Sequence, residues 1–482
     1  MGIEHENIHL ETSSAIFRQC PLDQIQGSAD FPVCTEDNPV VTNELLDVPA
    51  TTVVYDKNKE DSRVYGWDNE YGNKVAEVPA FRASKFLVSN AEFLDFVKDG
   101  GYTDDQWWTA EGWTWATYAK AEHPKYWLKE DGEWKLRCLA ETVDLPWSWP
   151  AVINQLEGKA FCNWKSAKTG KNIRMPSEDE WYALRRTGEL GAIDQPDWEN
   201  GKAPGNINLE HHASECPVDK FEWGNTGFYD VIGNVWQWTE SPVDALPGFE
   251  VHPLYDDFAT PTFDGKHTLF KGGSWISVGC NGATVESRYS FRRHFFQHAG
   301  LRYVESDVEV DQKMNMYETD PLVLAEIDTH YSAALLPGVE VFQAKIAAEV
   351  GELVTKMGKP TGRLLDVGCS VGRSTFELAR YFDECVGLDQ SARFIRSAVQ
   401  LQDDEVVRYT VPVEGELKSF HETSLEAHGL DDLADKCTFM QNDACNLDPK
   451  KFGKFDVVVA ANLVSHGLQL QSRWIVPTAA VS

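Results

Sequence analysis

The sequence lacks three features that would place it in particular surroundings. No apolar stretch approaches the roughly 18 residues that a membrane-spanning helix needs. The N-terminus is acidic from its fourth residue and has no apolar core of the kind found in secretory signals. The ten cysteines form no CxxC pair, which favours free thiols in a reducing compartment over a disulfide framework. We therefore expect a cytoplasmic protein without a membrane partner.

Positive charge is also scarce. The chain has 44 Lys and Arg against 76 Asp and Glu, and its formal net charge is −32 at pH 7. Such a field repels polyanions, so a nucleic-acid partner is not expected. Small polar molecules are the expected partners, and a solvated surface that aids solubility is the simple explanation of the charge itself.

Tryptophan content indicates how the 482 residues are organised. Sixteen of the 17 tryptophans lie between Trp67 and Trp275. Residues 1–50 predict a helix over 1–20 and then a linker, and residues 51–304 predict short strands, many turns and helices over 89–98 and 177–186. The acidic stretch 305–335 predicts a second linker. Residues 336–482 alternate strands and helices in the rhythm of an α/β, Rossmann-like parallel sheet.

A glycine-rich turn follows the first strand of that sheet. Gly368 and Gly372 allow the backbone to turn tightly and approach a ligand at the next helix N-terminus. Asp389 ends the following strand, where a carboxylate can accept both hydroxyls of a ribose, and Asp443 follows the third strand, where it could hold an adenine amino group. With Asp366 just before the first glycine, the pattern resembles class I S-adenosylmethionine (SAM) methyltransferases. A different nucleotide-binding sheet is the alternative.

Six motifs in the tryptophan-rich region occur in one order: 89–93, 158–164, 174–181, 227–240, 271–275 and 300–303. This order resembles the α+β, C-type-lectin-like domain of the formylglycine-generating-enzyme (sulfatase-modifying factor) superfamily. Formylglycine-forming members use a cysteine pair after the Gly-Gly-Ser turn. Ser277 and Gly282 stand at the matching positions, with Cys280 between them, so formylglycine formation is not expected.

The N-terminal helix carries two histidines at helical spacing. His5 and His9 are four positions apart, so both imidazoles lie on one helical face and can share one metal ion. Histidines on a solvent-exposed face are the simple alternative. Glu11 follows and points elsewhere on a regular helix.

The whole arrangement resembles the sulfoxide synthases of thiol-histidine biosynthesis, and with a C-terminal methyltransferase domain it is most similar to the ovothiol type, the 5-histidylcysteine sulfoxide synthases. The resemblance implies that the N-terminal helix is a remnant of a DinB-type helical bundle, and that His5 and His9 are two of three histidines that bind non-haem Fe(II). Dioxygen would be the cosubstrate for joining cysteine to the imidazole of histidine. SAM, held by Asp366, Gly368, Gly372, Asp389 and Asp443, would methylate the resulting thiohistidine.

The same resemblance leads us to expect truncation at both ends. The third iron-binding histidine belongs to an earlier helix of the bundle, and the methyltransferase sheet needs about three more strands after residue 460. The bundle face of the N-terminal helix would then be exposed. Histidines that could lend a substitute ligand are His211, His212, His252, His267, His294 and His298.

Other site residues are implied by the resemblance. Tyr255 best matches a tyrosine that tunes proton delivery near the iron, and a tyrosine packed with its hydroxyl hydrogen-bonded is the alternative. Arg288, Tyr289, Arg292 and Arg293 lie where relatives contact substrate carboxylates, although a salt-bridged strand would use the same residues.

Two other functions stay open. An ergothioneine-type sulfoxide synthase would use trimethylated histidine, although fused relatives of that kind usually carry the methyltransferase first. An inactive fragment that only binds SAM is the non-catalytic alternative.

Overall fold

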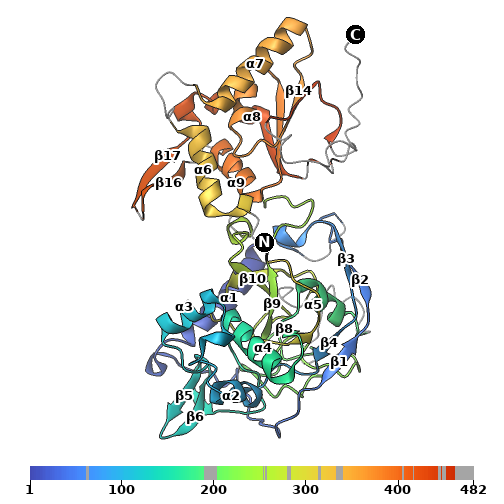
Figure 1. Ribbon diagram of the computed structural model, residues 1–482, viewed down its shortest axis with the longest axis vertical. Helices are drawn as coiled ribbons and strands as arrows, with labels where there is room; N and C mark the ends of the chain where they lie inside the picture. The colour runs from blue at the N-terminus through green and yellow to red at the C-terminus, as the bar shows by residue number, and fades with distance from the viewer. Residues whose placement is uncertain are drawn as a thin grey trace. The chain divides into compact units, whose positions relative to one another are not determined.

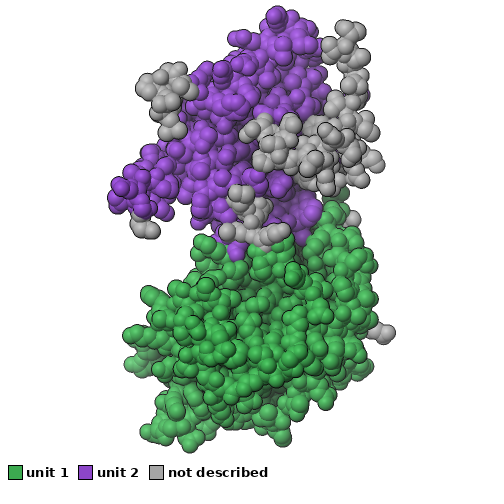
Figure 2. Space-filling view, in the orientation of Figure 1, with its two compact units in different colours: residues 1–243, 266–313 green, residues 244–265, 314–482 purple. Residues whose placement is uncertain are grey.

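The computed structural model describes residues 1–60, 65–188, 203–252, 254–255, 258–278, 284–312, 316–332, 340–403, 406–415, 417–442, 444, 447 and 452–461. The chain divides into two compact units, which Figure 2 colours separately. Unit 1 comprises residues 1–243 and 266–313, and unit 2 comprises residues 244–265 and 314–482. Within the described part, no helix has the length and apolar character needed to cross a bilayer.

The described strands of unit 1 form two four-stranded sheets and two smaller sheets (Figure 1). The first sheet has the order β1 (Leu45–Val48), β4 (Phe81–Ser84), β13 (Val304–Glu305), β8 (Ile173–Arg174). The second has the order β11 (Tyr289–Arg292), β10 (His267–Lys271), β9 (Trp236–Pro242), β12 (Ala299–Gly300). The smaller sheets are β2 (Thr51–Tyr55) with β3 (Lys74–Val78), and β5 (Trp127–Glu130), β6 (Glu133–Arg137), β7 (Thr142–Asp144). Strands from distant parts of the sequence are neighbours, so the unit depends on long-range pairing.

Polar side chains define where the helices of unit 1 begin. Helices α2 (Asn90–Lys98), α4 (Gln155–Thr169) and α5 (Glu178–Arg185) start after Ser89, Asn154 and Ser177. Each of these cap side chains accepts a hydrogen bond from the backbone N–H three residues on, which would otherwise lack a helical partner. The helices predicted over 89–98 and 177–186 are confirmed. The described residues of the tryptophan-rich region also form helix α3 (Ala110–Ala119).

Helix α1 spans Gly2–Phe17 and turns a largely polar face towards the rest of unit 1. Its buried residues are Glu11, Ser14 and Ala15. Ile3, Leu10 and Phe17 recur every seven positions and are 79%, 47% and 54% exposed. The helix predicted over 1–20 is thus confirmed over most of its length. Its apolar stripe faces outward.

The sheet of unit 2 is parallel throughout its described strands. Its order is β18 (Cys437–Gln441), β15 (Glu384–Asp389), β14 (Arg363–Val367), β19 (Val457–Val459). The helices that accompany it are α7 (Phe342–Met357), α8 (Arg373–Leu378) and α9 (Ala392–Gln402). This is the alternation that the sequence predicts, with the glycine-rich turn between β14 and α8.

Three features of unit 2 differ from the expected organisation. Strands β16 (Val407–Glu414) and β17 (Leu417–Thr423) form a hairpin that stands apart from the parallel sheet (Figure 1). Helix α6 (Asp320–Tyr331) occupies the predicted linker 305–335, because Val323, Ile327 and Tyr331 pack into the core of the unit. Residues 244–265, expected within the tryptophan-rich domain, group with unit 2, where Thr260–Thr262 contacts α9.

Candidate functional site

Glu11 fastens helix α1 to the turn that follows strand β10. Its Oε1 accepts hydrogen bonds from Trp236 Nε1 (2.6 Å) and Ser274 Oγ (2.5 Å), and its Oε2 accepts one from Ser277 Oγ (2.8 Å). All four residues are buried. Burial raises the pKa of the Glu11 carboxyl above its ordinary value, although the three hydrogen bonds act in the opposite direction. The helix is therefore attached through a buried polar junction.

A second polar contact lies further along the same helix. Arg18, just after α1, forms a buried ion pair with Glu215, with 2.5 Å between Nη1 and Oε1. Ser14 Oγ lies 2.8 Å from Nε2 of His298, and Arg18 Nη1 lies 3.5 Å from its Nδ1. Burial, together with Arg18, holds the pKa of His298 well below its ordinary value. Because both ring nitrogens are engaged, His298 anchors α1 and is not free to serve as a substitute metal ligand.

His5 and His9 lie side by side on α1. Their ring centroids are 4.4 Å apart with the rings nearly perpendicular, His5 is half-buried and His9 is exposed. Within the described part of the chain, no third histidine, cysteine or carboxylate ligand atom joins the pair within 4.8 Å. Two adjacent imidazoles suit a divalent transition metal. The pair therefore fits two positions of an iron site.

Trp67 lies between His5 and Tyr289, one of the predicted substrate-binding residues. The Trp67 ring lies against His5 with centroids 6.3 Å apart, and Trp67 Nε1 donates a hydrogen bond to Tyr289 Oη at 3.1 Å. The Tyr289 ring also contacts Trp236, the partner of Glu11, at 5.5 Å between centroids. The structure thus brings His5, Tyr289 and the Glu11 junction into one region of unit 1.

A cavity of about 770 Å³ opens beside α1. Thr12 and Ile16 line it from the helix, at three and seven positions after His9, so they continue the helical face that carries the histidines. Trp115, His294 and Phe296 also line it. Its volume lies in the range of small-molecule sites.

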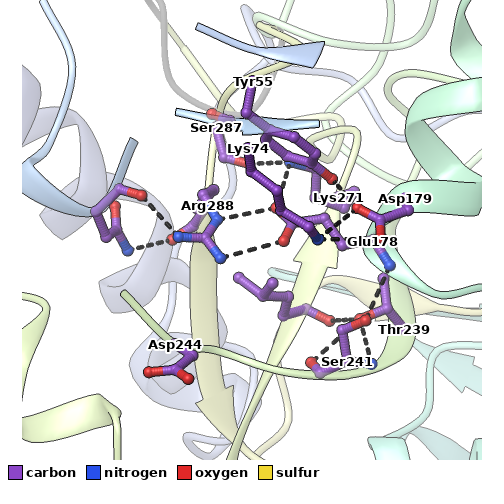
Figure 3. Close-up of polar contacts among 12 residues, drawn as sticks. Tyr55, Lys74, Glu178, Asp179, Thr239, Ser241, Asp244, Lys271, Ser287 and Arg288 are labelled. Carbon is purple, nitrogen blue, oxygen red and sulfur yellow. Dashed lines mark hydrogen bonds and ion pairs between the residues drawn. The ribbon is translucent and has the colours of Figure 1, made fainter. Parts of the chain in front are cut away.

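Arg288 is engaged in a buried charge cluster (Figure 3). Its Nε and Nη2 donate to the two carboxylate oxygens of Glu178 at 2.9 and 3.1 Å, and Nη1 donates to the Asn69 carbonyl at 2.8 Å. Lys271 Nζ lies 3.5 Å from Glu178. Burial alone would raise the pKa of Glu178, but Arg288 and Lys271 lower it to about 2, while burial lowers the pKa of Lys271 to about 8. This bidentate pairing favours the salt-bridge alternative for Arg288.

Other predicted site residues have contacts or a place in the fold of their own. Arg293 donates to Glu111 at 2.8 Å and to Thr268 at 3.2 Å, and Arg292 lies opposite His267 in the β10–β11 pairing. Tyr255 lies in a segment that groups with unit 2. Their roles stay predictions. Cys280, Gly282 and Asp443 lie outside the described residues.

The glycine-rich turn of unit 2 has a preorganised geometry. Gly368 and Gly372 adopt φ of +76° and +84°, and a side chain on Gly372 would come within 2.8 Å of Ala398. Buried Asp366 accepts hydrogen bonds from Ser374 Oγ and Thr375 Oγ1 at 2.7 and 2.8 Å, which ties the end of β14 to α8. The space next to the Gly372 Cα is therefore filled by neighbouring side chains, and a residue with a side chain would not fit there.

Asp389 lies at the carboxyl end of β15, beside this turn. Its two oxygens accept from the backbone N–H groups of Ser370 (3.0 Å) and Ser391 (2.8 Å). Burial raises the pKa of Asp389 to about 6, against the effect of these hydrogen bonds. Asp366, Gly368, Gly372 and Asp389 are thus brought together as the sequence predicts, and they fit the donor set of a nucleoside-containing cofactor.

Two family models match the chain. Residues 32–306, more than half of it, match the sulfatase-modifying factor enzyme 1-like domain. The chain belongs to the sulfatase-modifying factor enzyme 1-like family. Residues 365–473 match a methyltransferase domain. The predicted order of a formylglycine-generating-enzyme-like domain followed by a methyltransferase domain is therefore confirmed.

The sequence similarity to individual relatives covers only part of this chain and only part of each relative. It is 32% identical to hercynine oxygenase of Mycobacterium tuberculosis over 43% of this chain and 48% of that protein. It is 25% identical to ergothioneine biosynthesis protein 1 of Schizosaccharomyces pombe over 51% of this chain and 27% of that protein. Formylglycine-generating enzyme of Mus musculus is 27% identical over 49% of this chain and 68% of that protein. The chain spans about half the length of the hercynine oxygenases that it matches.

Sequence reasoning missed what Glu11 and Arg18 contact. Glu11, Ser14 and Arg18 stand at i, i+3 and i+7, a polar stripe at helical spacing that could have indicated a buried polar face. Ser277, at a position where formylglycine-forming relatives carry cysteine, donates its hydroxyl to Glu11. This family member therefore uses that position to hold a helix.

Proposed function

We propose that this protein is an Fe(II)- and O2-dependent sulfoxide synthase that joins cysteine to the imidazole of histidine, the 5-histidylcysteine reaction of ovothiol biosynthesis. The observation that carries the proposal is the His5–His9 pair on a helix that Glu11 fastens to the Gly-Gly-Ser-Trp turn. The similarity to proteins named hercynine oxygenase supports oxygen chemistry on a histidine derivative.

The reaction balances with one molecule of dioxygen. The thiol loses its S–H hydrogen and the imidazole loses a C–H hydrogen as the C–S bond forms. One oxygen atom goes to sulfur and the other leaves as water. Iron(II) held by His5 and His9, together with a further ligand, would supply the activation of dioxygen.

The residues around the pair would position the substrates. The cavity beside Thr12 and Ile16 would hold them on the histidine face of α1. Trp67 and Tyr289 would shield that face from water. Arg292 and Arg293 would pair with substrate carboxylates.

The second half of the proposal is methyl transfer to an imidazole nitrogen of the thiohistidine. Asp389 would accept the ribose hydroxyls of SAM, and the turn between Gly368 and Gly372 would let the backbone approach the cofactor. Asp366 holds that turn against α8. Bound there, SAM supplies the methyl group, and this domain would contribute proximity and orientation.

A second candidate is the ergothioneine-type reaction on hercynine, which is trimethylated histidine. The names of two relatives favour it. The order of the domains, with the methyltransferase domain last, supports histidine instead.

One experiment tests the proposal and separates the substrates. The protein is purified anaerobically, loaded with Fe(II), and given cysteine and oxygen with either histidine or hercynine. Mass spectrometry then follows the cross-linked sulfoxide. We expect product with histidine, and its loss in H5A and H9A. Product from hercynine alone would favour the second candidate, and iron that is retained without any sulfoxide would contradict both.

A further inference from the structure

A mixed group of metal-type ligands lies in unit 1, apart from the histidines of α1. It consists of Cys34 and Glu36 from the segment that follows α1, and His212 from the loop before β9. One sulfur, one carboxylate oxygen and one imidazole nitrogen lie within 4.8 Å of one another. Thiolate, imidazole and carboxylate are the ligands that Zn²⁺ takes in proteins, often three from the chain with a fourth position for water.

A cation already occupies this group. Lys220 Nζ donates to Glu36 Oε1 at 2.6 Å and lies 3.0 Å from Nε2 of His212. Since an ammonium has no acceptor, the lone pair of His212 Nε2 points towards it. The Glu36 carboxylate oxygen and the His212 ring nitrogen therefore both face the Lys220 ammonium.

Lys220 is placed so that a metal ion can displace it. Its side chain is 24% exposed, so the flexible stem can carry the ammonium out to solvent. Cys34, in contrast, is only 4% exposed, and its backbone N–H donates to Ser214 Oγ at 2.9 Å. The thiol is therefore held in place beside the loop that carries His212.

Hydrogen bonds fix the segment that carries Cys34 and Glu36 relative to the loop that carries His212. The Pro32 carbonyl accepts from the Ala213 N–H at 2.9 Å, and Trp149 Nε1 donates to the Glu36 carbonyl at 2.6 Å. Asn38 also donates to Asp219 at 2.8 Å. The ligands thus stand on backbone that is tied down on both sides of the group.

We propose that Cys34, Glu36 and His212 form a second metal site, with ligands of the kind that Zn²⁺ takes, in which Lys220 serves as the resident cation until the metal replaces it. Binding deprotonates the Cys34 thiol and expels the ammonium, so the positive charge at the site is retained. The ion would join the segment after α1 to the loop before β9. It would therefore strengthen the attachment of the helix that carries His5 and His9.

The test uses the full chain in an H5A/H9A background, so that metal at the α1 histidines does not contribute. Zn²⁺ is counted by elemental analysis, and Co²⁺ is added as a spectroscopic substitute. We expect about one ion per chain and a thiolate-to-cobalt absorption band in the near ultraviolet. C34S and H212Q should weaken binding by more than about 100-fold, since loss of a mere outer-shell partner costs 10–100-fold.

Matched variants provide the controls. C20S changes a cysteine that is not in the group, H211Q changes the neighbouring histidine, and both should bind Zn²⁺ as the parent does. K220M removes the competing ammonium and should bind more tightly, while circular dichroism checks that each variant folds. Equal binding by the parent and C34S, or cobalt binding without the thiolate band, would overturn the proposal. Neither result bears on sulfoxide synthesis, which is measured separately.

Discussion

The two candidate sites are encoded in different ways. In the methyltransferase domain, Asp366, Gly372 and Asp389 lie within one strand–turn–helix–strand segment, and short-range hydrogen bonds hold them. At the α1 site, Glu11 bonds to Ser274 and Ser277, which are 263 and 266 positions away. A locally encoded site can be recognised from spacing, whereas a site assembled over such distances depends on the whole fold. The following changes test that contrast.

The largest effect is expected from R288A. The substitution leaves buried Glu178 without its bidentate partner, with Lys271 Nζ 3.5 Å away. Loss of one member of a buried pair typically costs about 3–5 kcal/mol. R293A removes a partly exposed pair with Glu111 and should cost less than about 1 kcal/mol. Urea unfolding measures the loss of unfolding free energy in both variants. Wild-type stability of R288A with a raised KM for substrate would assign Arg288 to substrate binding instead.

E11A should have the next largest effect. Ser274 and Ser277 can pair with each other, but Trp236 Nε1 can only donate and would lose its acceptor. A buried donor without a partner costs about 1–3 kcal/mol. E11Q keeps one acceptor oxygen and should lose less. The free energy of unfolding, followed by Trp fluorescence, distinguishes them, and equal losses in the two variants would contradict the role of Glu11 as an acceptor.

G372A tests the local site. The left-handed backbone costs a side chain about 1–2 kcal/mol, and the new Cβ would lie 2.8 Å from Ala398 and 2.9 Å from Phe439. Gly358 has φ of +59° with nothing within 4 Å of a Cβ, so G358A carries the backbone cost alone. We expect G372A to be less stable than G358A and to lose SAM affinity, which isothermal calorimetry measures. Equal SAM affinity in the two variants would place the cofactor elsewhere.

Asp389 should make SAM binding depend on pH. Only the ionised carboxylate accepts both ribose hydroxyls, so affinity should fall as pH drops below about 6. Without SAM, the pH dependence of the folding stability has the opposite sign. Because the folded pKa is raised, the stability from this group is complete below its unfolded pKa of 3.8 and is lost as pH rises through about 6. D389N should bind SAM at least about tenfold more weakly and without this pH dependence, and an unchanged pH profile would contradict the assignment.

The contrast also explains what the sequence could predict. Strands β14 and β15 end where the sequence predicts, just before Gly368 and at Asp389, because apolar runs and glycines are local signals. Capped helices such as α2 and α5 were predictable for the same reason. The Glu11 junction was not, since no local pattern reports which distant serines meet a carboxylate. The β16–β17 hairpin was also missed: β16 alternates apolar residues from Val407 to Val413, but β17 is largely exposed and has no such alternation to indicate its partner.

The polar contact face of α1 also determines how the helix would respond to heat and denaturant. Exposure of apolar surface raises the heat capacity, whereas exposure of polar surface lowers it. Release of α1 would expose Glu11, Ser14 and Arg18, while Ile3, Leu10 and Phe17 are already in water. Detachment should therefore change the heat capacity and the urea dependence less than release of a helix with an apolar contact face. Trp236, which would lose its hydrogen bond to Glu11, is a local reporter of that release.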